Sequence, residues 1–310
     1  MTRVSHPART VTAMEQDYVR QAAIVMASLE LLPAQPSDLT GILRDPDQFH
    51  ALIDHDAQSY ESELVEYLRN SMDHSRIEYW HKQIDRLMIS EVAHPVLATD
   101  LSGGPAYPAR LAQCWDAPPI LFATADLSDP RDTVAIIGSR EATTEVLTQT
   151  RELAAQLAAD GATIVSGLAM GVDAAAHEGA LAVGGHTIAV LGTGITRIYP
   201  AQNVDLAQRI RHAGVLVSQF APHAPRTRTS FLRRNHVIAG LSEVSIIMAG
   251  ESRSGSRHEI EQAMAYGRTV LMWAPELERH LWACRLAETG RAAFISRADD
   301  VRDVLQENQL

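Results

Sequence analysis

Short apolar runs alternate with longer segments of mixed polarity through residues 119–310. The apolar runs are too short for helices. They predict strands at 119–123, 133–138, 163–166, 187–192, 215–219, 244–249, 269–273 and 293–295. The intervening segments predict helices at 142–160, 171–183, 203–213, 230–241, 256–266, 278–289 and 298–307. Strands that alternate with helices predict an α/β fold with a mainly parallel sheet covered on both faces.

The first third of the chain has a helical pattern instead. Apolar residues recur at helix spacing from Tyr18 to Leu29, in a run that ends at Pro33. Ser37 is placed to cap a short second helix, and residues 62–87 predict one or two more. We therefore predict a small helical domain at residues 1–92, with the first residues disordered.

A stretch rich in proline and glycine separates the two patterns. It runs through residues 93–118, contains Gly103-Gly104-Pro105 and closes at the Pro118-Pro119 pair. Such composition is typical of a connector. The expected organisation is therefore an N-terminal domain, a connector at 93–118 and an α/β domain at 119–310.

Composition adds limits on the class of protein. The chain has 310 residues and 46% hydrophobic residues, which suits a globule with one α/β domain and a smaller one. Cys114 and Cys284 fit no metal or redox spacing, and the longest apolar stretch, Ala22–Ala27, is far too short for a bilayer. We expect a cytoplasmic protein with no membrane contact, and neither a metal nor another cofactor.

The net charge is -11, which argues against diffuse binding of nucleic acid. The charge is uneven, however, because residues 223–236 hold four arginines and no acidic residue. This segment favours a local anion site over a solvated loop.

Three segments each begin with a predicted strand that stops at glycine and a small polar residue. These segments are Val134–Arg140, Ile164–His177 and Ile188–Gly194. In two of them a helix clearly follows. A glycine turn that leads into a helix leaves backbone N–H groups unpaired at the positive end of the helix dipole, where phosphate binds. Since the carboxyl ends of parallel strands share one edge, these turns predict a phosphate-binding surface.

The glycine turns belong to a longer series of motifs. In chain order it reads Tyr107-Pro108-x-x-Leu111, Gly138-Ser139-Arg140, Ser166-Gly167-Leu-Ala-x-Gly171-Val-Asp173-x-x-Ala176-His177, Gly184-Gly185-His-Thr-Ile-Ala-Val-Leu-Gly192-Thr-Gly194, Tyr199-Pro200-x-x-Asn203, Arg233-Arg234-Asn235-x-x-Ile238-Ala239-Gly240-Leu241-Ser242 and Ser254-Gly255-Ser256. Over roughly residues 105–273 this series resembles the DNA-processing protein A (DprA, or Smf) family. The helical N-terminal region is similar in position and type to that family's N-terminal domain.

The resemblance implies an extended Rossmann-like domain that binds single-stranded DNA. It also implies loading of a RecA-type recombinase during natural transformation, a homodimer formed through the Rossmann-like domain, and no enzymatic turnover. Carried over by motif, six residues would line the DNA phosphate pocket: Gly138, Ser139, Arg140, Ser166, Gly167 and Arg234.

The candidate phosphate-binding residues include further members of the same motifs. The whole set is Gly138, Ser139, Arg140, Ser166, Gly167, Gly171, Gly192, Thr193, Gly194, Arg233, Arg234, Asn235, Ser254, Gly255 and Ser256. Turn amides and arginine forks suit phosphodiesters. Binding of single strands also uses stacking aromatics, of which only Tyr199 and Phe231 flank the predicted pocket.

Several positions depart from the family's pattern. In Phe231–His236 a loop-stiffening proline is missing and the final arginine is a histidine. Ala249 stands where an acidic residue ends the strand, with Glu251 two positions later. An apolar pair and a threonine are replaced by Arg257-His258-Glu259, and Pro-Gly by Pro275-Glu276. The chain stops near the end of the sheet, so we expect no C-terminal winged-helix domain.

The altered segment Ser254–Val270 also resembles the Gly-Thr-x-x-Glu-Ile pattern of nucleoside deoxyribosyltransferases, and in kind the acidic motif of the "lonely guy" phosphoribohydrolases. This alternative makes the chain a nucleotide sensor or an N-glycosidase with Glu259 as the catalytic carboxylate. The simpler interpretation of Glu259 is a charge near a helix N-terminus. A third alternative is a scaffold that binds only a protein partner.

Five residues have two interpretations each. Asp173 and His177 share a helix face and could form an acid–base pair, although we favour a structural role. Ser166 could touch phosphate or cap the next turn. Of the consecutive arginines Arg233 and Arg234, at least one is expected at the pocket, but neighbours on a helix point in different directions.

Overall fold

The computed structural model of the chain describes residues 12–32, 36–54, 62–127, 132–250 and 255–308. The chain divides into two compact units. The first contains residues 1–107 and 118–124, and the second contains residues 108–117 and 125–310.

The first unit is mainly helical, as its pattern predicts. Its helices are α1 (Ala13–Leu31), α2 (Pro36–Arg44), α3 (Pro46–Ile53), α4 (Glu63–Ser71) and α5 (His74–Ile89). A capping box between Thr12 and Glu15 starts α1, which is buried almost continuously from Tyr18 to Ser28 and packs against α5. The Tyr18 hydroxyl donates to the Pro95 carbonyl at 2.9 Å.

The stretch predicted to be a connector is ordered and shared by both units. It contains β1 (His94–Leu97), which pairs antiparallel with β2 (Ile120–Ala123), and the one-turn helix α6 (Ala109–Ala112). The Tyr107 hydroxyl donates to the Pro118 carbonyl at 2.8 Å. This hydrogen bond joins the two ends of segment 108–117, which belongs to the second unit. The strand was not predicted, because it has four residues and includes a proline, which is typical of loops.

The described residues of the second unit contain seven consecutive strands of a sheet. Its strands are β3 (Thr133–Gly138), β4 (Thr163–Ser166), β5 (Thr187–Val190), β6 (Val215–Ser218), β7 (Val244–Ala249), β8 (Thr269–Trp273) and β9 (Ala293–Ile295). Its longer helices are α7 (Thr144–Ala159), α8 (Val172–Ala182), α9 (Val204–Ala213), α10 (Arg228–Leu241), α11 (Gly255–Ala265), α13 (Leu281–Glu288) and α14 (Ala298–Glu307). A turn of 3-10 helix, η1 (Ala201–Asn203), precedes α9.

These elements confirm the predicted α/β fold with a mainly parallel sheet. The largest difference is the single helix predicted at 278–289. The chain instead forms the short α12 (Ala274–Leu277), which has Pro275 in its first turn, and then α13 after a break. Proline is favoured in the first turn of a helix, so Pro275 starts a helix where the pattern predicts a loop.

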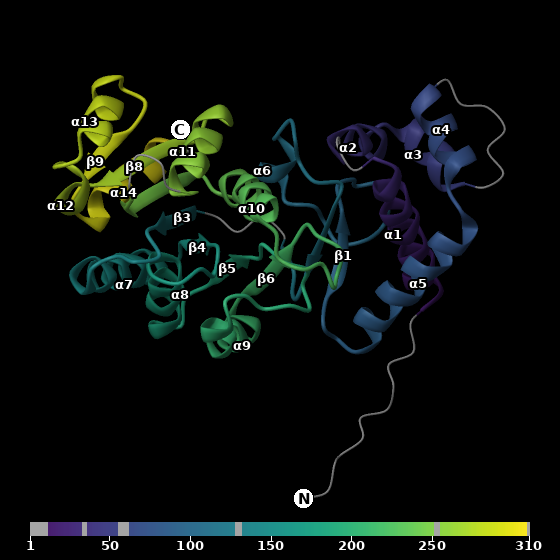
Figure 1. Cartoon of the computed structure of the whole chain (residues 1–310), viewed down its shortest axis with the longest axis horizontal. Coiled ribbons are helices and arrows are strands. Elements are labelled where there is room, and N and C mark those ends of the chain that lie inside the picture. Colours follow the sequence, from purple (N-terminus) through teal and green to yellow (C-terminus); the bar gives the residue numbers. More distant parts are fainter. Residues whose placement is uncertain (1–11, 33–35, 55–61, 128–131, 251–254, 309–310) are drawn as a thin grey trace, which may run out of the picture. The chain divides into compact units, whose positions relative to one another are not determined.

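The strand order is β6-β5-β4-β3-β7-β8-β9, and every pair in this sheet is parallel. From β3 the chain winds outward through β4 and β5 to β6. It then returns through α10 to β7, on the other side of β3 (Figure 1). The winding direction therefore reverses between β3 and β7, and a crevice forms at the carboxyl ends of strands where this happens.

Candidate functional site

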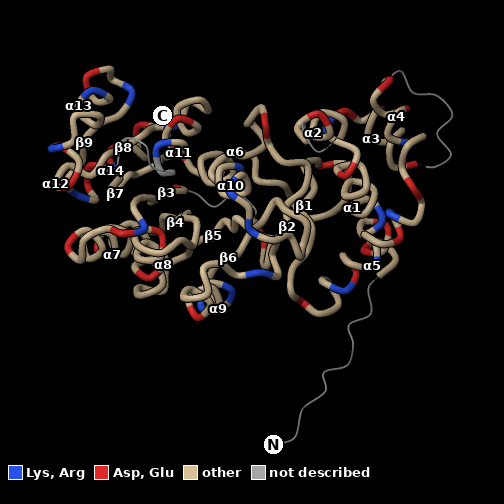
Figure 2. Tube along the Cα trace, in the orientation of Figure 1, with Lys and Arg blue, Asp and Glu red and all other residues tan. Residues whose placement is uncertain are grey.

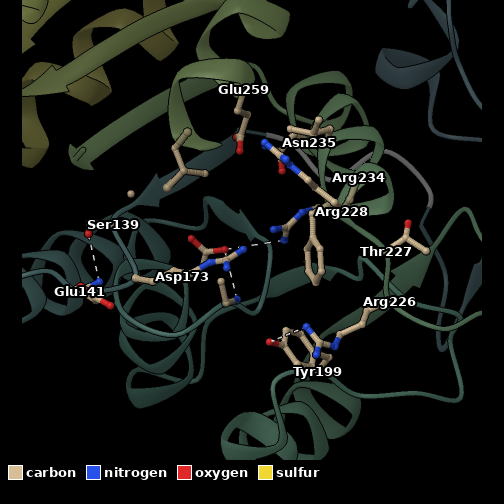
Figure 3. Close-up of a pocket in the computed structure, with 16 residues that line it drawn as sticks. Ser139, Glu141, Asp173, Tyr199, Arg226, Thr227, Arg228, Arg234, Asn235 and Glu259 are labelled. Atoms are coloured by element: carbon tan, nitrogen blue, oxygen red, sulfur yellow. Dashed lines mark hydrogen bonds and ion pairs between the residues drawn. The ribbon is translucent and has the colours of Figure 1, made fainter. Parts of the chain in front are cut away.

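A pocket of about 730 Å³ lies in the second unit at the reversal of strand order. It is lined by the loop after β3, the loop after β4, Tyr199, the start of α10 and one residue of α11. We call it the switch-point pocket. Figure 3 shows its side chains converging from these separate elements.

The loop between β4 and α8 is held by two side chains. The Asp173 carboxylate accepts hydrogen bonds from the backbone N–H groups of Gly167 at 3.2 Å and Ala169 at 3.3 Å. The Asn203 amide donates to the carbonyls of Leu168 and Ala169 at 2.9 and 3.1 Å. These hydrogen bonds fix the loop before any ligand binds. They hold Leu168 in the left-handed region of backbone conformation, at φ 58°.

Arg234 is the buried cation of the pocket. Only 5% of the residue is exposed, its Nη1 donates to the Val190 carbonyl at 3.2 Å, and it lies 3.8 Å from Asp173 Oδ2. Burial raises the pKa of Asp173, and the nearby Arg234 guanidinium opposes this effect. Arg234 is therefore a positively charged group that is held in place in the wall of the pocket and is largely excluded from water.

Three exposed arginines, Arg140, Arg226 and Arg228, surround the same pocket. Within the described part of the chain, none of them forms an ion pair. Arg226 lies over the Tyr199 ring, 4.6 Å from its centroid, and Arg140 lies 5.6 Å from the centroid of Phe231. These guanidinium groups are available to an anionic ligand.

The two aromatic residues form a contact inside the arginine group. The ring centroids of Tyr199 and Phe231 are 5.7 Å apart with an interplanar angle of 58°. Arg234 also lies 5.9 Å from the Phe231 ring. The two rings therefore offer a stacking surface close to the guanidinium groups of the pocket.

The N-terminus of α10 faces the pocket. Thr227 caps this 14-residue helix through a reciprocal pair of hydrogen bonds with Ser230. Ser230 also donates to the Gly192 carbonyl at 2.6 Å, which fixes the helix start to the end of β5. Arg226 and Arg228 flank this cap, so the helix dipole and two guanidinium groups act on the same volume.

Glu259 lines the pocket from α11 and is only 2% exposed. Burial raises the pKa of its carboxyl group well above the ordinary value, an effect that nearby Arg234 only partly opposes. Burial therefore disfavours the ionised form of this carboxyl group.

Of the candidate phosphate-binding and catalytic residues, six line the pocket: Gly138, Ser139, Arg140, Arg234, Asn235 and Glu259. Tyr199 and Phe231, predicted to flank it, also line it, as does Asp173. The structure places seven other candidates outside the lining: Ser166, Gly167, Gly171, Gly192, Thr193, Gly194 and Arg233. Ser254 lies outside the described residues, as does Glu251, and Gly255 and Ser256 stand at the start of α11.

The residues outside the lining have packing roles instead. The Ser166 hydroxyl is buried and donates to the Ile136 carbonyl at 2.7 Å. A Cβ atom at Gly171 would lie 2.4 Å from the Ser139 carbonyl, and one at Gly194 would lie 2.2 Å from the Ala221 carbonyl. These motif glycines permit close approach of two chain segments rather than of a ligand.

Three more candidate residues outside the lining also contact other parts of this chain. The Thr193 hydroxyl donates to the Arg197 carbonyl. A Cβ atom at Gly192 would lie 2.6 Å from the Phe231 ring, so this glycine makes room for the aromatic residue. Of the consecutive arginines, Arg234 enters the pocket, whereas Arg233 lies over Phe220 at 5.7 Å.

Asp173 and His177 do not form an acid–base pair. Asp173 holds the loop after β4, while the buried His177 ring contacts the Thr187 hydroxyl at 2.7 Å through Nδ1. Burial lowers the pKa of His177 to about 3. The structural interpretation of both residues agrees with these contacts.

His236, which replaces an arginine of the resembled family, does not line the pocket. Its Nδ1 hydrogen-bonds with the carboxyl group of Asp116, which also accepts a hydrogen bond from the Tyr266 hydroxyl. The Tyr266 oxygen lies 3.3 Å from His236 Nδ1, and the His258 ring lies 5.4 Å from the His236 ring. The replacement is therefore part of a separate polar cluster.

The candidate list omitted Arg226, Arg228 and Glu141, all of which line the pocket. The signal for the two arginines was the acid-free segment 223–236, which leads into α10. Figure 2 shows basic positions in blue at α10. Nothing in the pattern around Glu141 marks it, since it lies in an exposed turn.

Fold and pocket together define a doubly wound α/β protein with an arginine-rich pocket at its switch point. The sequence model of the family described as DNA recombination-mediator protein A matches residues 100–306. The chain belongs to this family, which confirms the resemblance found in its motifs.

Curated relatives include Protein Smf of Synechocystis sp., 36% identical over 200 residues, which are 62% of this chain and 50% of that protein. DNA processing protein DprA of Bacillus subtilis is 32% identical over 199 residues, 63% of this chain and 66% of that protein. The chain thus matches between half and just under two thirds of the length of these relatives.

Two solved structures are similar in fold. DprA of Streptococcus pneumoniae aligns with a TM-score of 0.63 and 25% identity, covering 95% of this chain and 98% of that one. DNA processing protein A of Helicobacter pylori aligns with a TM-score of 0.60 and 31% identity, covering 66% of this chain and 95% of that one. Within the described residues, no helix has the length and apolar character needed to cross a membrane.

Proposed function

We propose that this protein binds single-stranded DNA in the switch-point pocket and acts in DNA uptake or recombination, delivering the strand to a RecA-type recombinase. The observation that carries the proposal is a set of three exposed arginines around one pocket, Arg140, Arg226 and Arg228, which form no ion pair with any residue that the structure describes. Guanidinium groups without carboxylate partners on an acidic protein are suited to phosphodiesters.

The pocket also has a favourable charge balance for a polyanion. Asp173 is matched by Arg234, and burial favours the neutral form of Glu259. Among the lining residues that the structure describes, the three exposed arginines outnumber the exposed acidic residue, Glu141. The similar H. pylori structure is described by that protein's single-stranded DNA binding mode, which supports the same ligand here.

The aromatic contact favours a single strand over a duplex. Tyr199 and Phe231 lie among the arginines, where an unpaired base could reach them while its phosphates contact the guanidinium groups. In a duplex the faces of the bases are stacked on one another and are not accessible to side chains.

Fluorescence anisotropy with a labelled oligo-dT tests the proposal. The double variant Arg140→Ala with Arg228→Ala should bind more weakly, and its slope of log affinity against log salt should be shallower by about 1.4, because each phosphate contact contributes about 0.7. Arg151→Ala is the matched control, because Arg151 is paired with Glu178 at 2.8 Å and lies outside the pocket. Salt-independent binding, or equal losses in both variants, would contradict the proposal.

A second candidate function, N-glycosidic bond cleavage, depends on the position of Glu259 in the pocket. A carboxylate nucleophile must be ionised, whereas burial favours the neutral acid here. Incubation with nucleosides and nucleotides, followed by chromatography for released base, separates the candidates. Turnover that Glu259→Gln abolishes would support the enzyme.

A further inference from the structure

Two histidines, His236 of α10 and His258 of α11, meet outside the switch-point pocket. Their ring centroids are 5.4 Å apart and the interplanar angle is 49°. The two helices pack against each other, and α6 packs against α10 on the same side of the sheet (Figure 1). Both histidines stand at positions where the chain departs from the pattern of the resembled family. Two separate departures therefore come together at one place in the fold.

The carboxyl group of Asp116 orients the His236 ring. Asp116 follows α6, and its carboxyl group hydrogen-bonds with His236 Nδ1 and accepts a hydrogen bond from the Tyr266 hydroxyl. A neutral imidazole that donates its Nδ1 proton to a carboxylate carries its lone pair on Nε2. Histidine ligands of metal ions are almost always held in this way, because the carboxylate fixes the ring and increases the basicity of the ligating nitrogen.

The separation of the two rings matches that of two histidine ligands of one ion. With Zn–N bonds of about 2.0–2.1 Å, each ring centre lies about 3.2 Å from the ion, and a tetrahedral angle puts the two centres about 5.2 Å apart. The observed separation of 5.4 Å agrees with this value. Within the described residues, His258 forms no hydrogen bond or ion pair that would occupy its ring nitrogens.

The ligands beyond the two imidazoles have to be water. Among the described residues, no group of three histidine, cysteine, aspartate or glutamate side chains could hold a metal ion. His236 and His258 are both partly exposed, so water can reach the space between them. Imidazole is a preferred ligand of Zn²⁺, whereas Mg²⁺ and Ca²⁺ prefer oxygen ligands. No spacing marks this pair in the sequence, because its members lie on different helices, and for this reason the motifs predict no metal.

We propose that His236 and His258 together bind one Zn²⁺ ion, with Asp116 as the positioning residue of His236 and water at the remaining coordination positions. The ion joins α10 to α11, the helices that carry Arg234 and Glu259. The inference goes beyond the proposed function and does not depend on it, because none of the three residues lines the switch-point pocket.

Titration calorimetry of the metal-free full chain with zinc chloride tests the inference. Wild type should bind one equivalent of Zn²⁺, and His236→Ala and His258→Ala should each abolish this binding. Asp116→Asn keeps both ligands but removes the carboxylate, so the affinity for Zn²⁺ should fall about 10-fold to 100-fold. His223→Ala is the matched control and should bind as wild type does, since it changes an exposed imidazole of the same unit that contacts the Thr196 hydroxyl at 2.7 Å.

Melting temperatures separate a loss of the metal site from a loss of the fold. His258→Ala removes a partly exposed side chain, so without metal it should melt as wild type does. Added Zn²⁺ should raise the melting temperature of wild type and of His223→Ala but not that of His258→Ala, because an ion that binds only the folded chain stabilises it.

Wild type that binds no equivalent of Zn²⁺ would overturn the inference. Binding that survives in both His236→Ala and His258→Ala would also overturn it, since the ion would then occupy other surface histidines. Neither outcome bears on the proposed function, which is judged by the salt-dependent and arginine-dependent anisotropy of labelled oligo-dT. An absence of strand binding with an intact Zn²⁺ site would in turn contradict only the proposed function.

Discussion

A Cβ atom at Gly167 would lie 1.3 Å from Nη1 of Arg234, so the guanidinium group occupies the space that any side chain at position 167 would need. The motif glycine after β4 is therefore required by the protein itself. It allows the buried arginine of α10 to reach the Val190 carbonyl and the Asp173 carboxylate. Loop and helix are fixed to each other at this point.

Gly167→Ala should displace Arg234 and impair both folding and binding. We expect a loss of about 1–3 kcal/mol in the free energy of unfolding, the usual cost of overpacking a filled site. Affinity for single-stranded DNA should fall at the same time. Urea unfolding and anisotropy on the same preparation measure the two effects.

The control for this substitution is Gly41→Ala, in α2, where an added Cβ meets nothing within 4 Å. There alanine should stabilise by up to about 1 kcal/mol through helix propensity. Unchanged stability and affinity in Gly167→Ala would show that the Arg234 side chain has another position available, and the argument for a fixed cation would be lost.

Arg234 and Arg140 should differ in stability although both line the pocket. Arg234→Ala leaves Asp173 buried without its ion-pair partner, and we expect a loss of about 3–5 kcal/mol. Arg140→Ala removes an exposed side chain without an ion pair in the described part of the chain, so stability should change by less than about 0.5 kcal/mol. Thermal unfolding of the two variants side by side checks the contrast. Similar losses would contradict the placement of Arg234 as the structural cation.

The strands of the second unit were predictable because strands buried on both faces are continuous apolar runs. β3 and β4 each show this pattern and end where the sequence changes to glycine or serine. Because the carboxyl ends of parallel strands lie at the same edge of a sheet, the turns that follow these strands were expected to lie close together. β1 was not predicted, because its four residues form a strand by pairing with β2 and have no strand pattern of their own.

The candidate site was predictable as a region but not residue by residue. An arginine pair on a helix does not reveal which member points inward, and the choice of Arg234 depends on the space left by Gly167. The burial of Glu259 is equally invisible, since its position in the first turns of α11 is also typical of an exposed charge. Long-range packing decided both outcomes.

His177 should make the protein less stable in acid. Burial lowers the folded-state pKa of His177 to about 3 from an ordinary value of 6.5, so below pH 6.5 the unfolded chain binds a proton that the folded chain excludes. Stability from this group is fully present above pH 6.5 and is lost as the pH falls toward 3. Between pH 7 and pH 5 the loss should be about 2 kcal/mol.

Urea unfolding of wild type and His177→Gln at these two pH values isolates the effect, since other groups titrate in both proteins. The variant should lose about 2 kcal/mol less than wild type on going to pH 5. His74→Gln, which changes an exposed imidazole of α5, controls for removal of a histidine. Equal losses in wild type and His177→Gln would show that the ring is not held neutral by burial.

Glu259→Gln should stabilise the protein increasingly as the pH rises. The folded-state pKa of Glu259 is raised above 4.5, so the folded chain keeps a proton that the unfolded chain releases. Wild-type stability therefore falls as the pH rises from 4.5 through the folded-state pKa, by up to about 1.4 kcal/mol per pH unit, and glutamine does not titrate. Melting temperatures at pH 5 and pH 8 should show a small variant advantage that grows. If Arg234 instead paired with an ionised Glu259, the folded-state pKa of Glu259 would be lowered and the advantage would become a loss. The sign of the measured difference therefore identifies the direction of the pKa shift of Glu259.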